Sequence, residues 1–356
     1  MHIIFKKKAA RRLGLFVATI VLSLGVSAAD TVDSYIEEFP NQQQARMMTA
    51  WLKTNLPGTF IFSGLVDPNN TTVVTPQATV DYGSNWFSVS NGPAIIRTPS
   101  YSRFFSVSIF DMKHNIPAVI VNPQLPIIIM RPGQIIPQGD FTVVEIETDQ
   151  GLAFTRMVVV NNMDEVRELS RAITMTGGNG TMNRVIHTFS PAVENAALAE
   201  IQRTGIPMNP DIAFGKKSGD VDPLVLARAV NLGQLGTPPD SVRYSVRFTD
   251  DAGAPLNGED SYTLTVPANI VHDEGYYSIT LYGTEDKALM PNPQKRYDRT
   301  TFSSTPNTEG TYTLELNPSG AGSNGIPTGE AFYAVLRAYV PVGGADLTMQ
   351  VTRVAQ

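Results

Sequence analysis

Short runs rich in β-branched and aromatic residues, separated by Asn, Pro and Gly clusters, dominate residues 59–160. Such runs are typical of β-strands, because these side chains fit a pleated sheet and the separating residues favour turns. Their spacing favours a sandwich or barrel over a parallel sheet with helical crossovers. The predicted strands are Thr59–Phe62, Ala94–Arg97, Phe104–Phe110, Ala118–Val121, Ile127–Met130, Phe141–Ile146 and Phe154–Val160.

Helical periodicity lies on both sides of this β region. Before it, the apolar spacing predicts a helix over Asn41–Leu56, which ends at Pro57-Gly58. After it, residues 162–233 repeat with a helical period and carry Ser-Pro and Asp-Pro pairs, which are typical helix starts. The helices predicted there run from Asn162 to Gly177, from Ser190 to Gly205 and from Asp222 to Gly233.

The pattern returns to strands in the last third of the chain. Val242–Thr249 alternates apolar and polar positions, as a strand with one buried face does. The other strands predicted here are Ser261–Val266, Tyr276–Tyr282, Thr311–Leu316 and Phe332–Val340. We therefore expect a mainly β protein with two antiparallel, jelly-roll-like β-sandwich domains joined by a helical segment. The expected divisions are residues 29–160 (a helix and the first sandwich), 161–235 (the helical bridge) and 236–356 (the second sandwich).

The first 28 residues have the layout of a secretory signal peptide. Five basic residues between Lys6 and Arg12 precede the apolar run Leu13–Val26, which ends in the small residues Val26-Ser27-Ala28. The run is too short to span a membrane comfortably. We expect cleavage after Ala28, with Ala29 as the near alternative, and hence a periplasmic or secreted bacterial protein.

Composition and charge narrow the classes of partner. The 356 residues are 42% hydrophobic, which suffices for a large core, and include no cysteine, which excludes disulfides and thiol nucleophiles. The signal segment holds five of the 27 basic residues and none of the 33 acidic ones, so its removal changes the net charge from −6 to −11. An acidic, exported chain is a poor partner for nucleic acids and anionic membranes. We expect neither partner, and the sequence leaves a homo-oligomer open.

Two stretches of the chain carry closely spaced motifs. The first lies in Pro76–Lys113 and centres on Tyr82-Gly83-Ser84-Asn85-Trp86-Phe87. The second includes the motifs Asp251-x-Gly253-x-Pro255-Leu256-x-Gly258, Tyr277–Tyr282 and Leu336-Arg337-x-Tyr339-x-Pro341. These stretches resemble the tandem DUF1254/DUF1214 family of bacterial envelope proteins. The resemblance implies two antiparallel β-sandwich domains linked by helices, and it implies no established reaction, because both domains are named for their unknown function.

Most motifs of metal, cofactor and catalytic sites are absent from the sequence. Without the signal segment only His114, His187 and His272 remain, widely separated and without the spacing of metal ligands. Gly215-Lys216-Lys217-Ser218 lacks the earlier glycine of a phosphate-binding loop, and no Gly-x-Ser-x-Gly elbow occurs. We therefore expect no metal and no cofactor, and interpret residues 215–218 as a solvated turn.

One constellation of reactive side chains falls in the first predicted sandwich. Asp111 and His114 follow the strand that ends at Phe110, where loops of a sandwich gather functional groups. A carboxylate beside a histidine could act as a general base, because the acid orients and charges the imidazole. The alternative, which we favour, is that Asp111 caps a turn and His114 is exposed. The other members of this constellation are Tyr82, Trp86 and Arg103.

A second constellation falls in the C-terminal region. Its tyrosines and arginines suit stacking on sugar rings and pairing with carboxylates, although ordinary cross-strand packing explains the same composition. Its members are Tyr277, Tyr282, Asn292, Arg296, Tyr297, Arg337 and Tyr339. Alternation places Arg337 and Tyr339 opposite Phe332 and Leu336, and therefore on the open face of the sheet if the latter two enter the core.

These residues suggest two functions. The first is an envelope protein that binds a glycan or another small polar ligand in an aromatic and arginine-lined cleft between the two β units. The second is a hydrolase or lyase that acts on a glycan or ester through Tyr and Arg or through the Asp111–His114 pair. The sequence alone does not decide between them, and the geometry of Asp111 and His114 is the feature that separates them.

Overall fold

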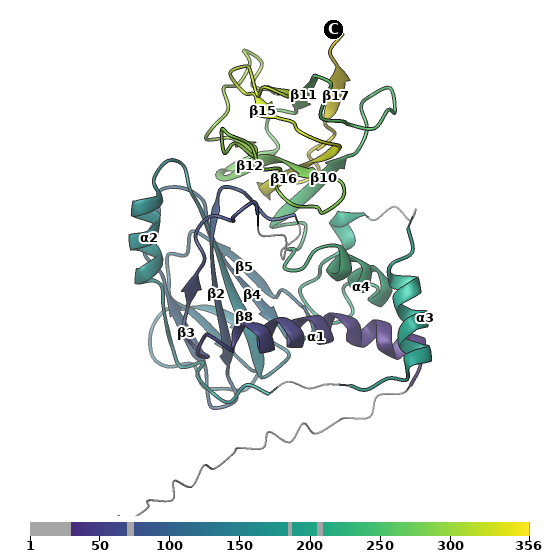
Figure 1. The fold of residues 1–356 in the computed structure, drawn as a ribbon. Coiled ribbons are helices and arrows are strands. Elements are labelled where there is room, and N and C mark those ends of the chain that lie inside the picture. The colour runs from purple at the N-terminus through teal and green to yellow at the C-terminus, as the bar shows by residue number, and fades with distance from the viewer. Residues whose placement is uncertain (1–29, 70–74, 184–186, 205–208, 356) are drawn as a thin grey trace, which may run out of the picture.

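The computed structural model describes residues 30–69, 75–183, 187–204 and 209–355. The predicted signal peptide, residues 1–28, lies outside the described residues. Within them the chain is mainly β, as predicted, with four sheets and four α-helices. Figure 1 shows two β units, with the N-terminal unit in purple to teal, the C-terminal unit in green to yellow, and the helices around the N-terminal unit.

The N-terminal unit packs two sheets face to face. The first sheet has the order β1 (Ile61–Phe62), β2 (Val80–Ser88), β8 (Gln150–Val158), β4 (Phe105–Asp111) and β5 (Ala118–Val121). The second has the order β7 (Thr142–Glu145), β6 (Ile127–Met130), β3 (Ala94–Arg97) and β9 (Thr174–Thr176). The core between them is fully buried and includes Val107 and Ile109 of β4 with Ile127 and Ile129 of β6. One pair, β6 with β7, is parallel rather than antiparallel.

The register of β4 against β8 places two loops at one end of the first sheet. Asp111, the last residue of β4, pairs with Gly151 at the start of β8. A Cβ on Gly151 would lie 2.4 Å from the carbonyl oxygen of Phe110, so only glycine fits this close approach. As a result, the turn that follows β4 and the loop that precedes β8 lie side by side.

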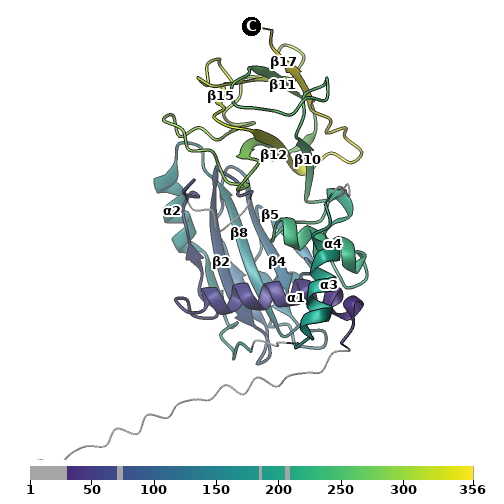
Figure 2. The ribbon, with the colours of Figure 1, turned by 45° about the vertical axis from the view of Figure 1, so that its right-hand side comes forward.

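A helical layer covers the outer face of the five-stranded sheet. Helix α1 (Val32–Trp51) crosses β2, β8 and β4, and α3 (Pro191–Ile201) and α4 (Pro223–Leu232) pack near one of its ends (Figures 1 and 2). The side chains buried in this layer include Phe39 and Met48 of α1 and Trp86 and Phe110 of the sheet. The sheet is therefore buried on both faces, by the second sheet and by the helices.

Three helix predictions were wrong at their ends: α1 ends at Trp51 and not at Leu56, and α3 ends at Ile201 and not at Gly205. Helix α1 begins at Val32 and not at Asn41, because the side chain of Thr31 caps it by accepting from the Ser34 amide, and Pro40 lies inside the helix. Helix α2 (Met163–Ala172) ends at Ile173 and not at Gly177. The following residues form β9, which pairs with β3, so sheet pairing overrides the helical pattern there.

The C-terminal unit is a second pair of packed sheets. One sheet has the order β10 (Val242–Arg247), β16 (Phe332–Pro341), β12 (Val271–Gly283) and β13 (Asp298–Thr300). The other has the order β15 (Ile326–Pro327), β14 (Tyr312–Asn317), β11 (Tyr262–Val266) and β17 (Gln350–Arg353). Phe332 and Leu336 enter the core between them, as predicted, together with Leu264, Ile279 and Leu314.

The opposite face of the β16 sheet is not open, and this corrects the prediction made for Arg337 and Tyr339. Both side chains are on that face but are only 6% and 4% exposed. The N-terminal unit covers them, because residues 75–80 dock on β12 and β16. The Tyr282 hydroxyl donates to Pro76 O at 2.7 Å, and Arg337 Nη2 donates to Thr75 O at 2.8 Å.

Candidate functional site

A cavity of about 550 Å³ opens between α1, the end of the first sheet and the segment that leads into α4. Its walls come from residues 37–41 of α1, the turn 112–115 after β4, the loop 148–150 before β8, and residues 215–226. We call it the sheet-end cavity. It is the place where the two loops aligned by β4 and β8 meet the helical layer.

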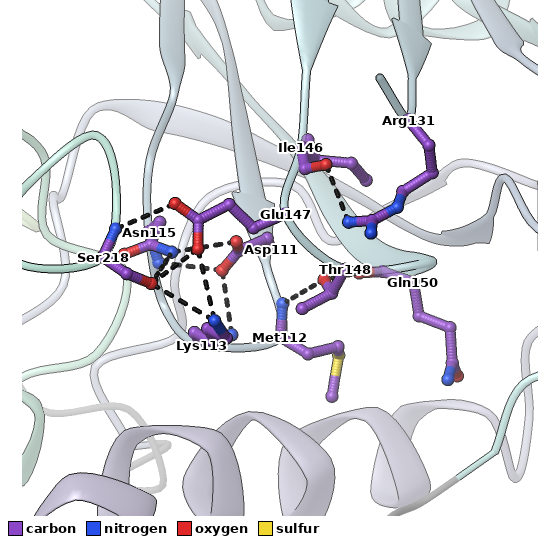
Figure 3. Close-up of polar contacts among 10 residues, drawn as sticks. All are labelled: Asp111, Met112, Lys113, Asn115, Arg131, Ile146, Glu147, Thr148, Gln150 and Ser218. Carbon is purple, nitrogen blue, oxygen red and sulfur yellow. Dashed lines mark hydrogen bonds and ion pairs between the residues drawn. The ribbon is translucent and has the colours of Figure 1, made fainter. Parts of the chain in front are cut away.

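The turn after β4 is organised by the carboxylate of Asp111. Its oxygens accept from the Lys113 amide at 2.8 Å, the Asn115 amide at 3.0 Å and Asn115 Nδ2 at 2.9 Å (Figure 3). Gln44 Nε2 of α1 donates to Asp111 O at 3.3 Å and joins the turn to the helix. Burial raises the pKa of Asp111, and the hydrogen bonds from Asn115 oppose that rise. Asp111 therefore caps the turn, which is the interpretation that the sequence favoured.

A second carboxylate, that of Glu147, is not a lining residue itself but joins three segments that line the cavity. Glu147 accepts from Ser218 N at 3.0 Å and from Ser218 Oγ at 2.6 Å, and Lys113 Nζ lies 3.3 Å away (Figure 3). The hydrogen bond from Ser218 is the main cause of a lowered Glu147 pKa. Asn115 Nδ2 also donates to Ser218 Oγ at 3.3 Å. Residues 215–218 are a largely exposed turn, as predicted, and Gly215, Lys217 and Ser218 also line the cavity.

The floor beside this wall is fixed by amide and hydroxyl groups. Thr148 Oγ1 accepts from the Met112 amide at 3.0 Å and donates to Gln150 O at 2.7 Å. The carboxamide of Gln150 pairs with both backbone groups of Asn183, at 2.7 and 3.1 Å. Arg131 braces the same loop by donating to Ile146 O at 3.0 Å (Figure 3). The lining is therefore held in place before any ligand binds.

His114 lines the cavity but forms no pair with Asp111. Its ring stacks on Phe214 with centroids 5.6 Å apart, and the edge of Phe110 lies against it at 5.5 Å. Nε2 accepts from the Leu235 amide at 3.5 Å, and burial lowers the pKa of His114 to about 4, so the imidazole is neutral near pH 7. The side chain is 2% exposed, so the prediction that it is exposed was wrong.

The other residues of the first constellation are not brought to the cavity. The Tyr82 hydroxyl accepts from the Gln77 amide at 3.0 Å, and its ring stacks on Phe154. Trp86 is buried beneath α1 with its edge against Trp51. Arg103 Nη1 donates to Val160 O at 3.4 Å. All three have local structural partners.

The second constellation holds the C-terminal unit together. Asn292 Nδ2 donates to Arg296 O at 3.0 Å, and the Arg296 amide donates to Asn292 Oδ1 at 3.1 Å. Arg296 Nη1 donates to Gly320 O and Gly325 O, both at 3.1 Å, and so braces the loop between β14 and β15. Tyr297 packs on the cluster of Ala78, Tyr282 and Tyr333. The aromatic and arginine-rich region between the two β units is therefore filled by the chain itself and is not a cleft.

Sequence reasoning missed Asn115 and Glu147, and it considered Ser218 only as part of a solvated turn. Glu147 and Ser218 are 71 positions apart and form no motif, so no local signal could have found them. Among the described residues, no group of three or more His, Asp or Glu side chains could hold a metal ion. No helix within the same residues has the length and apolarity needed to cross a membrane.

Comparison with known proteins places the chain among proteins of unknown function. A family model described as a protein of unknown function (DUF1254) matches residues 57–177, and another (DUF1214) matches residues 241–343. The crystal structure of the VPA0106 protein from Vibrio parahaemolyticus is similar, with a TM-score of 0.71, 17% identity, and coverage of 91% of this chain and 98% of that one.

A more distant likeness is to a putative uncharacterized protein from Burkholderia cenocepacia. The TM-score is 0.51 and the identity 10%, over 92% of this chain and 91% of the other. No curated protein matches the sequence. At these identities the likenesses establish a shared fold and carry no activity with them.

Proposed function

This chain belongs to the family that carries the DUF1254 and DUF1214 domains in tandem. From that premise we propose that it is an exported envelope protein and that it binds a small hydroxyl-rich ligand, such as a glycan, in the sheet-end cavity. The observation that carries the proposal is the Glu147–Ser218 contact, which joins distant segments around an open cavity lined by both polar and apolar residues. The export half rests on the basic and apolar pattern of residues 1–28.

The cavity has the size and lining of a small-ligand site. Its volume of about 550 Å³ lies within the range of roughly 300–1,000 Å³ that is usual for such sites. Polar groups such as Asn41 and Lys217 stand beside apolar Met112 and Leu226. A sugar presents hydroxyl groups that both donate and accept, together with apolar ring faces, and so matches this mixture. The lining includes no Trp, Tyr or Phe side chain, so recognition would rest on hydrogen bonds rather than stacking.

Binding is supported over catalysis by the state of the two reactive groups. The Asp111 carboxylate is engaged by Lys113 and Asn115, and the imidazole of His114 is held between two Phe rings. A general base needs its carboxylate on the imidazole and a free nitrogen near the substrate. The hydrolase or lyase alternative therefore loses the Asp111–His114 pair, one of the two sets of groups on which it was based.

Thermal-shift screening of residues 29–356 against monosaccharides, disaccharides and polyols tests the proposal, with calorimetry for each ligand that stabilises the protein. The chain offers a matched pair of variants in adjacent lysines. Lys217 lines the cavity, whereas Lys216 pairs with Asp240 outside it. Lys217→Ala should weaken binding about fivefold or more and Lys216→Ala should leave it unchanged. Equal affinities for both variants, or no stabilising ligand, would refute the proposal.

A further inference from the structure

A second cavity, of about 310 Å³, lies in the helical layer where α1, α3 and α4 meet. It shares no lining residue with the sheet-end cavity. We call it the three-helix cavity. Its polar lining residues are Gln43, Arg46, Glu194, Gln202, Asn231 and Gln234.

The cavity is open to solvent and has a polar rim. Phe39 of α1 and Val230 of α4 are buried at its base, and Leu198 of α3 is partly buried. On the rim, Gln43 and Glu194 are partly buried, and the exposed side chains are Arg46, Gln202, Asn231 and Gln234. These polar groups are therefore within reach of a small ligand that enters from solvent.

Two opposite charges face this cavity without pairing. Arg46 of α1 and Glu194 of α3 both line it, and no ion pair joins them. The Tyr35 hydroxyl donates to Glu194 Oε1 at 3.3 Å. The pKa of Tyr35 is raised first by burial and then by the charge of Glu194, whereas Arg46 opposes the rise, so both charges lie close to the same hydroxyl. A ligand in the cavity would therefore reach a cation and an anion at once.

We propose that the three-helix cavity binds a zwitterion that carries both a carboxylate and an ammonium group, namely a free amino acid or a short peptide. Arg46 would bind the carboxylate, because a guanidinium matches it with two parallel hydrogen bonds. Glu194 would bind the ammonium group. The carboxamides of Gln43 and Gln202 would bind amide groups, since each offers a donor and an acceptor. The small volume admits one or two residues rather than a protein segment.

Calorimetric titration of residues 29–356 with free amino acids and dipeptides tests this assignment. Each ligand that binds is compared with its N-acetylated form and its C-terminal amide. The proposal expects both blocked forms to bind at least about tenfold more weakly, because each loses one charge-assisted contact. Single amino acids and dipeptides are titrated separately, so the same series shows which ligand length the cavity prefers.

The variant Arg46→Gln keeps a polar, helix-forming residue and should bind at least about tenfold more weakly. Its control is Arg167→Gln on α2, which removes an exposed arginine whose partner is Asp164, outside the cavity. Circular dichroism verifies that both variants fold. Lys217→Ala should not change zwitterion binding, so failure at this cavity is distinct from failure of the sheet-end cavity. Three results would overturn the proposal. They are no binding up to about 10 mM, which corresponds to a negligible affinity, equal binding of the blocked forms, and unchanged binding by Arg46→Gln.

Discussion

The carboxylate of Asp298 accepts a hydrogen bond from the hydroxyl of Thr79 at 3.0 Å, across the junction between the two β units. Asp298 is 7% exposed, and burial raises its pKa from 3.8 to about 6. The same junction holds the carboxamide of Gln77, which accepts from Ser278 at 3.2 Å and from Thr280 at 3.3 Å. The two units are thus joined by buried polar contacts whose strength depends on pH.

Asp298→Asn should stabilise the protein at pH 7.5 and have little effect at pH 4. The folded state holds the Asp298 proton more tightly than the unfolded chain does. The contribution of this group to the free energy of unfolding is therefore complete below pH 3.8 and is lost as the pH rises through about 6. A shift of this size corresponds to at most about 3 kcal/mol, and asparagine avoids that cost while it can still accept from Thr79. Urea unfolding at the two pH values measures the effect. The control is Asp164→Asn, a fully exposed carboxylate, and a loss of stability at pH 7.5 would contradict the burial argument.

Arg337→Ala should destabilise the protein rather than act on a ligand. The guanidinium bonds Thr75 O at 2.8 Å and lies over the Tyr282 ring at 5.5 Å. Its removal leaves a cavity and an unpaired carbonyl at the junction, a loss of about 2–4 kcal/mol. Denaturant unfolding and limited proteolysis measure it. Arg167→Ala is the control, because Arg167 is exposed and its ion pair with Asp164 should contribute less than about 1 kcal/mol. Equal stability of the two variants would return Arg337 to the list of ligand-binding candidates.

The apolar periodicity of the sequence predicted those helices and strands whose buried face follows from their own residue pattern. The strands β5 and β6 have the predicted bounds, and α4 begins after the predicted cap, where Asp222 accepts from the Leu224 and Val225 amides. The alternation in β16 also assigned Phe332 and Leu336 to the core correctly. What alternation cannot reveal is whether the other face of a sheet meets water or another domain. For Arg337 that depends on Gln77 and Thr75, which lie 260 and 262 positions away. For Tyr339 it depends on Phe104, whose ring centroid lies 5.1 Å from its own.

Only one part of the candidate site, the turn that follows β4, was predictable from the sequence. Asp111 follows a clear strand, and its turn-capping role agrees with the spacing to Lys113 and Asn115. The wall partner Glu147 reaches the site because β4 and β8 are neighbours, and Ser218 reaches it through the helical segment. Both depend on topology, so a single sequence carries no signal for them.

Ser218→Ala should weaken binding of a sheet-end ligand about five- to tenfold with a small change in stability. The variant loses the 2.6 Å hydrogen bond from Ser218 Oγ to Glu147, which fixes residues 215–219 against the sheet. Because both groups are exposed, the loss in unfolding free energy should stay below about 1 kcal/mol. Calorimetry with the ligand identified by screening measures the affinity. Ser319→Ala, whose hydroxyl donates to Asn317 in a distant loop, should bind normally, and a matching loss there would show that the Glu147 contact is irrelevant.

His114 should give stability a pH dependence opposite to that of Asp298. The imidazole is buried with a pKa lowered from 6.5 to about 4, so the unfolded chain binds its proton more tightly. The contribution of His114 to the free energy of unfolding is present above pH 6.5 and is lost as the pH falls through about 4. This loss is at most about 3 kcal/mol. His114→Asn removes the titration and keeps a residue that tolerates the φ of 66° at this position. Its stability, measured relative to wild type by urea unfolding, should therefore improve as the pH is lowered from 7 to 4. Asp298→Asn should show the reverse trend, and the double variant should show almost none relative to wild type, since the two contributions are similar in size. Parallel trends for the two single variants would mean that one of these groups is not buried in the folded protein.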